Sequence, residues 1–154
     1  MNYLPIFVST RGCRAIVVGG GLLAEAKCRA LLKTAAEVVL FCQEPTPVML
    51  QWRDECRLQL ETRACDRSDL QTAGLVYAAS QCDQDNARIA QLSNQAAVWV
   101  NVVDRPDVCD FITPAIVDRD PVVVAIGTEG TAPVLAQQIK LDVESMLPIH
   151  LGLV

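Results

Sequence analysis

The chain has 154 residues, 51% of them hydrophobic, and its 13 Lys and Arg against 18 Asp and Glu give a net charge of −5. This length fits one domain with a small appendage and allows a sizeable core. The acidic balance argues against an extended nucleic-acid footprint, and no uncharged stretch is long enough to span a membrane. The N-terminus lacks the pattern of a secretory signal, so we expect a cytoplasmic protein.

The cysteines favour neither a disulfide framework nor a structural zinc site. There are seven, an odd number, and no two form a C-x-x-C pair. We therefore expect mostly buried free thiols in a reducing compartment. The only histidine is His150, so a histidine-dependent mechanism would have to use that residue. Metal ligands stay unknown at this level.

The first informative pattern is an apolar run at residues 16–18 that leads into three glycines and then into helical spacing. Read as G-x-G-x-x-A, it assigns the tight turn to Gly19 and close backbone approach to a pyrophosphate to Gly21. Ala24 then allows the helix to pack closely on the strand. N–H groups at the start of the helix would bind a diphosphate. The alternative is a glycine-rich turn without a ligand.

The second strand, expected at residues 37–42, ends in Gln43 and Glu44. Dinucleotide-binding folds often place an acid here for the ribose hydroxyls, which makes Glu44 a candidate. No arginine adjoins it in the sequence to neutralise a 2′-phosphate, and this favours NAD over NADP. The alternative is a solvated Glu before Pro45, which would start a helix.

Strands and helices alternate over about the first hundred residues. This order predicts an α/β, Rossmann-like, doubly wound parallel sheet, with ligands at the carboxyl ends of its strands. Ala79, Ser80 and Asn101 lie at two such ends and join the candidate cofactor contacts. The strands are expected at residues 15–18, 37–42, 58–62, 74–79 and 97–101, and the helices at 22–34, 46–56, 66–72 and 86–95.

The pattern changes after Pro106. Strand-like runs at residues 110–117 and 121–126 have only three residues between them, which favours an antiparallel hairpin. A helix over residues 132–147 follows, with Thr131 as its candidate N-cap. Because a hairpin and one helix cannot bury both their faces, we expect a dimerisation appendage. We therefore place an NAD-binding domain at 1–112 and the start of a dimerisation and substrate region at 113–154.

Asp104, in the N-V-V-D sequence at residues 101–104, is the strongest catalytic candidate. A carboxylate at the ligand-binding edge could accept a proton while a hydride leaves for NAD+. The alternative is an Asp that builds the turn into Arg105 and Pro106.

An anionic substrate has several candidate contacts. Arg105, Arg119 and Lys140 either contact it or are ordinary surface charges. The loop formed by Thr128, Glu129, Gly130 and Thr131 could present backbone N–H groups to carboxylates, although the charge of Glu129 opposes this.

Several separated motifs occur along the chain: LPIF at 4–7, VVGGG at 17–21, AEAK at 24–27, NVVD at 101–104, FITPAIVDR at 111–119, GTAPVLA at 130–136 and ESMLP at 144–148. In this order they resemble the precorrin-2 dehydrogenase/ferrochelatase module of sirohaem synthase, from Tyr3 to the last residue. The family's loop before Thr131 is typically rich in Ser and Gly, whereas this chain has Glu129.

The resemblance implies oxidation of precorrin-2 to sirohydrochlorin with NAD+, followed by Fe2+ insertion to give sirohaem. Asp104 matches the family's general base, and Leu22, Leu23, Gln43 and Glu44 match its NAD contacts. Thr128, Gly130 and Thr131 become the substrate-loop candidates.

The resemblance also implies a homodimer. From charge and hydropathy we expect neither nucleic-acid nor membrane partners. The family's helical region continues past the position of Val154 and can be fused to a methyltransferase domain, so we expect a truncated chain. Two alternatives stay open: a non-catalytic NAD-sensing module, and a dehydrogenase without chelatase activity.

Overall fold

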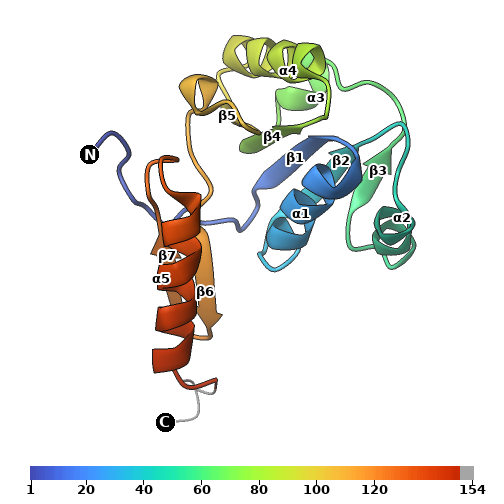
Figure 1. Cartoon of the computed structure of the whole chain (residues 1–154). Helices are drawn as coiled ribbons and strands as arrows, with labels where there is room; N and C mark the ends of the chain where they lie inside the picture. The colour runs from blue at the N-terminus through green and yellow to red at the C-terminus, as the bar shows by residue number, and fades with distance from the viewer. Residues whose placement is uncertain (150–154) are drawn as a thin grey trace. The chain divides into compact units, whose positions relative to one another are not determined.

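The computed structural model describes residues 1–149, and the chain divides into two compact units. Phe7–Phe111 forms the larger unit, and Met1–Ile6 joins the segment from Ile112 onward in the smaller one (Figure 1). The contribution of the N-terminal residues to the second unit is not evident from the sequence. His150 lies outside the described residues.

A five-stranded parallel sheet forms the centre of the larger unit, in the order β3-β2-β1-β4-β5. This confirms the predicted α/β, Rossmann-like class. β1 is central, and its Val17 pairs with Leu40 on one side and Tyr77 on the other. The strands are β1 (Arg14–Gly19), β2 (Glu37–Phe41), β3 (Gln59–Glu61), β4 (Leu75–Ala79) and β5 (Trp99–Val102).

Helices cover both faces of this sheet (Figure 1). α1 (Gly21–Leu31) and α2 (Pro47–Asp54) pack on the face that receives Ala15 and Val17. α3 (Arg67–Leu70) and α4 (Asp83–Gln95) pack on the face that receives Ile16 and Val18. Because both faces are buried, the strands are continuous apolar runs rather than alternating ones.

The elements around α4 differ from the expected bounds. α4 begins at Asp83, three residues before the expected start at 86, and its first turn carries Asp83 and Asp85. Carboxylates are favourable near a helix N-terminus, so these residues extend the helix rather than form a loop. Ala97, expected in the next strand, has a φ of 54° and turns the chain after the helix, so β5 starts at Trp99.

The smaller unit contains the antiparallel hairpin β6 (Ala115–Arg119) and β7 (Val122–Ile126), followed by α5 (Pro133–Met146). This confirms the predicted hairpin and helix. The turn lies at the cis Asp120-Pro121 bond, so β6 runs two residues past the expected end at 117. α5 packs on β6, where Val117 and Ala136 are buried. No described helix is long and apolar enough to cross a membrane.

The glycine that ends β1 generates a stability prediction. Gly19 has a φ of +140°, and an added Cβ would collide with the carbonyl of Ala79 in β4. Gly19→Ala should lower the free energy of unfolding by about 3 kcal/mol, because neither backbone can move without breaking the strand pairing. Urea denaturation measures this loss.

Gly12 is the matched control. It also has a positive φ, +68°, but nothing lies within 4 Å of the position that an added Cβ would take. Gly12→Ala should therefore cost only the backbone term, about 1 kcal/mol. Equal losses in the two variants would contradict the close approach at Gly19.

Candidate functional site

A groove of about 500 Å³ lies at the carboxyl ends of β1, β2 and β4. This volume is in the range of sites for small molecules and cofactors. Of the predicted cofactor contacts, Gly19, Gly21, Gln43, Glu44 and Ser80 line it. The other lining residues are Val18, Gly20, Phe41, Cys42, Thr46, Arg63, Ala64, Cys65, Gln81, Asp85 and Arg88.

The glycine turn, Gly19 to Gly21, forms one wall of the groove, and its backbone is not covered by side chains of its own. A Cβ on Gly20 would come within 3.2 Å of Cys42 Sγ, and one on Gly21 within 3.2 Å of Gln81 Nε2. Gly20 is the N-cap of α1, and no side chain caps the helix. The first-turn N–H groups can thus be used for a diphosphate, which is the chemistry that the G-x-G-x-x-A pattern predicts. Ala24 is fully buried under the helix, as close packing requires.

A buried asparagine holds the loop after β4, and sequence reasoning missed it. Ser80 N donates to Asn86 Oδ1, and Asn86 Nδ2 donates to Ser80 O, both at 2.9 Å. Asn86 is only 5% exposed. The available signal was its place on the helix stripe of Ile89, Ala90 and Ser93, where a polar side chain needs a partner. The paired bonds fix the position of Ser80 in the groove wall.

Two arginines that sequence reasoning did not place at the site also line the groove. Arg63 donates from Nη1 and Nη2 to the two oxygens of Asp69, at 2.8 and 2.7 Å. Arg88 Nη1 donates to the carbonyl of Cys65 at 2.9 Å. The sequence has no arginine beside Glu44, but the pairing of β2 with β3 brings Arg63 into the same groove.

Asp104 follows β5, away from the residues that line the groove. Its side chain is exposed, and its φ of 59° lies in the left-handed region. Asp adopts this conformation more readily than most residues, and the Arg105 N–H donates to Val102 O at 3.2 Å in the same turn. The turn-building alternative therefore has a structural basis, and it leaves the carboxylate accessible.

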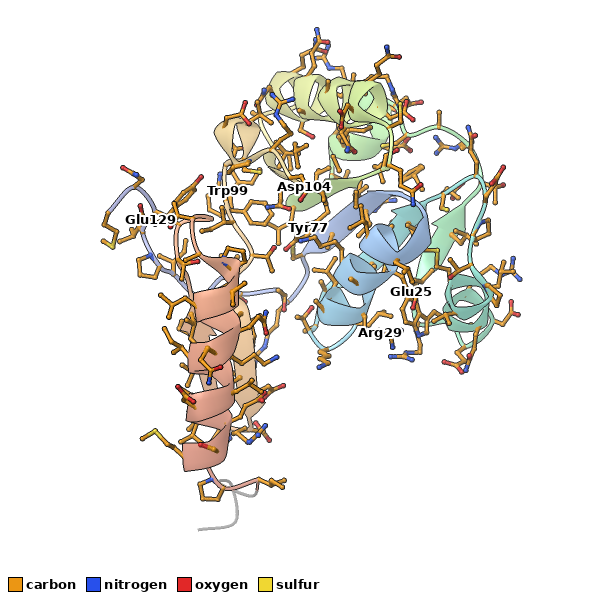
Figure 2. All side chains as sticks on the ribbon, in the orientation of Figure 1. Glu25, Arg29, Tyr77, Trp99, Asp104 and Glu129 are labelled. Carbon is orange, nitrogen blue, oxygen red and sulfur yellow. The ribbon has the colours of Figure 1, made fainter. Side chains whose placement is uncertain are left out.

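Lys27 of α1 supplies positive charge on the Asp104 side of the sheet. Its Nζ lies 5.3 Å from the ring centroid of Tyr77, which packs edge-on against Phe111. Burial lowers the pKa of Lys27, while Cys109 and Asp104 act to raise it. Figure 2 labels Tyr77 and Asp104 in this region. The lysine thus adds a positive charge that interacts with Asp104.

Four other predicted contacts lie outside the groove lining. Asn101 is buried, and its Nδ2 donates to Phe111 O at 2.9 Å, which braces the loop after β5. Ala79 is buried beneath Gly19. Leu22 and Leu23 are exposed on the first turn of α1. Their roles as cofactor contacts stay predictions.

The predicted substrate loop belongs to the smaller unit. Thr131 is not the helix N-cap, which is Ala132; its hydroxyl donates instead to Thr128 O at 2.7 Å and closes a turn. Glu129 and Gly130 have φ values of 52° and 77°. Glu129 accepts hydrogen bonds from the backbone and side-chain nitrogens of Asn2, at 2.8 and 3.2 Å. The N-terminal segment thus holds the carboxylate expected to oppose substrate binding.

All seven cysteines are free, as predicted, but only Cys28, Cys42 and Cys65 are buried. Within residues 1–149, no three or more His, Cys, Asp or Glu side chains gather in a way that could hold a metal ion.

The chain is similar in sequence to a protein family and to individual proteins. A family model described as "Putative NAD(P)-binding" matches residues 6–115. Siroheme synthase of Methylococcus capsulatus is 38% identical over 152 residues, which are 99% of this chain and 32% of that protein. Siroheme synthase of Escherichia coli O1:K1 is 39% identical over 99% of this chain and 33% of its own length. The chain thus spans about a third of these relatives.

A solved structure described as SirC, precorrin-2 dehydrogenase, superposes with a TM-score of 0.81 at 21% identity. The match covers 96% of this chain and 72% of that one. It shows that the two chains share a fold.

The Arg63–Asp69 pair generates a pH prediction. Hydrogen bonds from Arg63 hold the pKa of Asp69 at about 2, below its ordinary value. A depressed carboxyl pKa stabilises the fold above the unfolded-state pKa, and that stability is lost as the pH falls towards the folded-state pKa. The wild-type advantage over Asp69→Asn should be constant above about pH 5 and shrink between about pH 4 and 2, as measured by denaturant unfolding. A pH-independent difference would contradict the pairing.

Proposed function

Because the chain belongs to the NAD(P)-binding family whose model it matches, we propose that it is an NAD-dependent dehydrogenase that oxidises precorrin-2 to sirohydrochlorin. The observation that carries this proposal is the uncapped glycine turn, which lines a groove of cofactor size together with Glu44. The similarity to siroheme synthases and the fold shared with a precorrin-2 dehydrogenase support the choice of substrate.

The cofactor site follows from the strand order. First-turn N–H groups of α1 bind the diphosphate. At the end of β2, the carboxylate of Glu44 accepts hydrogen bonds from the ribose hydroxyls. The adenosine half then lies on the β2 side of β1, and the nicotinamide half extends towards β4 and β5. Bound NAD+ supplies an acceptor for the hydride that leaves precorrin-2.

Asp104 acts as the general base. Oxidation of precorrin-2 removes a hydride from one carbon and a proton from a neighbouring position, and an Asp104 carboxylate oxygen accepts that proton. Asp104 follows β5, the strand towards which we expect the nicotinamide half to extend, and Lys27 of α1 interacts with it electrostatically. The left-handed backbone at Asp104 is the type of conformation that is common at functional sites.

Insertion of Fe2+ into sirohydrochlorin is the second proposed activity. The entering metal ion displaces two pyrrole N–H protons, so this step also needs a proton acceptor. We assign it to the same carboxylate, with Fe2+ as a substrate rather than a resident cofactor. The name siroheme synthase of the relatives supports sirohaem as the final product. The methyltransferase fusion expected from the resemblance stays a prediction.

Replacing Asp104 tests the base. Asp104→Asn should lower kcat for precorrin-2 oxidation by about a hundredfold or more, because the amide cannot accept the proton. The Kd for NAD should not change. NADH absorption measures the first quantity and calorimetry the second.

Asp107→Asn is the matched control: Asp107 is an exposed carboxylate of the same loop, paired with Arg105 at 2.9 Å, and its loss should leave turnover unchanged. Full turnover in Asp104→Asn would contradict the assignment. Absence of NADH formation by the wild-type chain would favour the NAD-sensing alternative. Sirohydrochlorin with Fe2+ or Co2+, followed by absorption, tests whether the same variant loses chelation.

A homodimer formed by the smaller unit completes the proposal. A two-stranded hairpin with one helix is marginal alone, and both elements expose apolar side chains. Val134, Leu141 and Met146 of α5 are 82%, 58% and 78% exposed. On β7, Val122 and Val123 are 41% and 44% exposed. A second copy of this surface is the partner that the family resemblance implies.

Leu141→Asp tests the dimer. Placing a charge on the apolar face of α5 should raise the dimer dissociation constant at least about tenfold, as measured by sedimentation equilibrium. Val108→Asp, on the other unit, is 39% exposed in the wild type and should leave association unchanged. A wild-type chain that stays monomeric at high concentration would contradict the dimer.

A further inference from the structure

We propose that Arg63 stacks on the adenine of the bound dinucleotide, and that its pairing with Asp69 makes the site select NAD over NADP. This inference rests on the proposed function, since it presupposes a dinucleotide in the groove. Arg63 and Asp69 would then determine the specificity for NAD over NADP, in addition to the glycine turn and Glu44.

The sheet places Arg63 at the adenosine end of the groove. Phe41 and Glu61 are register partners, and Cys42 N donates to Glu61 O at 2.9 Å. The chain segments after β2 and β3 therefore run side by side. Glu44 comes from the first and Arg63 from the second, and both line the groove. A ribose held by Glu44 would present its adenine to the β3 side.

The guanidinium of Arg63 is held in a defined orientation. Its Cζ lies 5.1 Å from the ring centroid of Phe41, and Asp69 binds both Nη atoms. Asp69 is itself fixed, because it accepts from Asp66 N at 2.9 Å and its side chain is only 11% exposed. The Arg63 side chain remains 51% exposed. A planar cation supported on one side by an aromatic ring is a suitable surface for a purine.

The same contacts disfavour a 2′-phosphate. In an NADP site, an arginine would offer its Nη donors to that phosphate. Here both Nη atoms of Arg63 donate to Asp69, and Nη1 also donates to Ala64 O. Two carboxylates, Glu44 and Asp85, line the groove. Arg88 is the other arginine of the lining, and one of its donors is bound to Cys65 O. A dianionic phosphate would therefore meet repulsion and few available donors.

Calorimetric titration of NAD and NADP into the chain tests the stacking. The wild type should bind NAD more tightly, and Arg63→Ala should weaken NAD binding about tenfold. Arg63→Lys keeps the charge but not the plane, so it should show a similar loss. Full NAD affinity in either variant would overturn the stacking role.

Arg57→Ala is the matched control. The Arg57 Cζ also lies over an aromatic ring, 6.0 Å from the Trp52 centroid, and its Nη1 is 3.5 Å from Glu55. It is 47% exposed, close to the value for Arg63, but it is not part of the groove. NAD affinity should be unchanged in this variant. An equal loss would show a general effect of removing charge and would overturn the proposal.

Asp69→Asn tests the selectivity. The amide keeps the shape and one acceptor but releases the guanidinium fork, so the ratio of the NADP Kd to the NAD Kd should fall about tenfold. An unchanged ratio would overturn the role of Asp69. If the wild-type chain binds NAD and all the variants have its NAD and NADP affinities, only this inference is contradicted. If the wild-type chain binds neither dinucleotide, the proposed function is contradicted.

Discussion

The close approach of the glycine turn to the neighbouring strand ends is the constraint on which the rest of the structure depends. Gly19 lies against the backbone of Ala79, and a Cβ on Gly20 would come within 3.2 Å of Cys42 Sγ. These contacts let β1 pair with β4 up to its last residue, Gly19, and with β2 up to Val18. They also leave the first turn of α1 open to the groove. One steric requirement thus sets both the packing of the sheet and the shape of the proposed cofactor site.

Charge is distributed along the ends of the strands in a way that separates two tasks. On the β2–β3 side, Glu44 and Arg63 line the same groove, and Arg63 is paired with Asp69. On the β4–β5 side, Lys27 is partly buried over Tyr77 and interacts with Asp104. The first group suits recognition of a nucleoside, and the second suits proton transfer. The parallel order β2-β1-β4-β5 connects them at one edge of the sheet.

The sequence predicted what depends on local patterns and missed what depends on pairing between distant segments. The apolar runs and the glycines identify the sheet and the turn, because both signals are contained in short stretches. Asn86 holds Ser80 by hydrogen bonds, and Arg63 is paired with Asp69. Only the folded chain brings Arg63 into the same groove as Glu44. The sequence predicted Thr131 as an N-cap, but its hydroxyl donates to Thr128 O in the preceding turn. α5 therefore begins without a side-chain cap.

A dinucleotide bound along the glycine turn, with its diphosphate on the first turn of α1, is the part of the proposal on which the rest depends. The most direct test is a two-dimensional amide NMR titration of the isotope-labelled chain with NAD. The amide signals of Gly20, Gly21 and Leu22 should shift most, together with that of Glu44, because these groups line or border the groove. Shifts confined to other surfaces, or no shifts at saturating NAD, would contradict this binding mode.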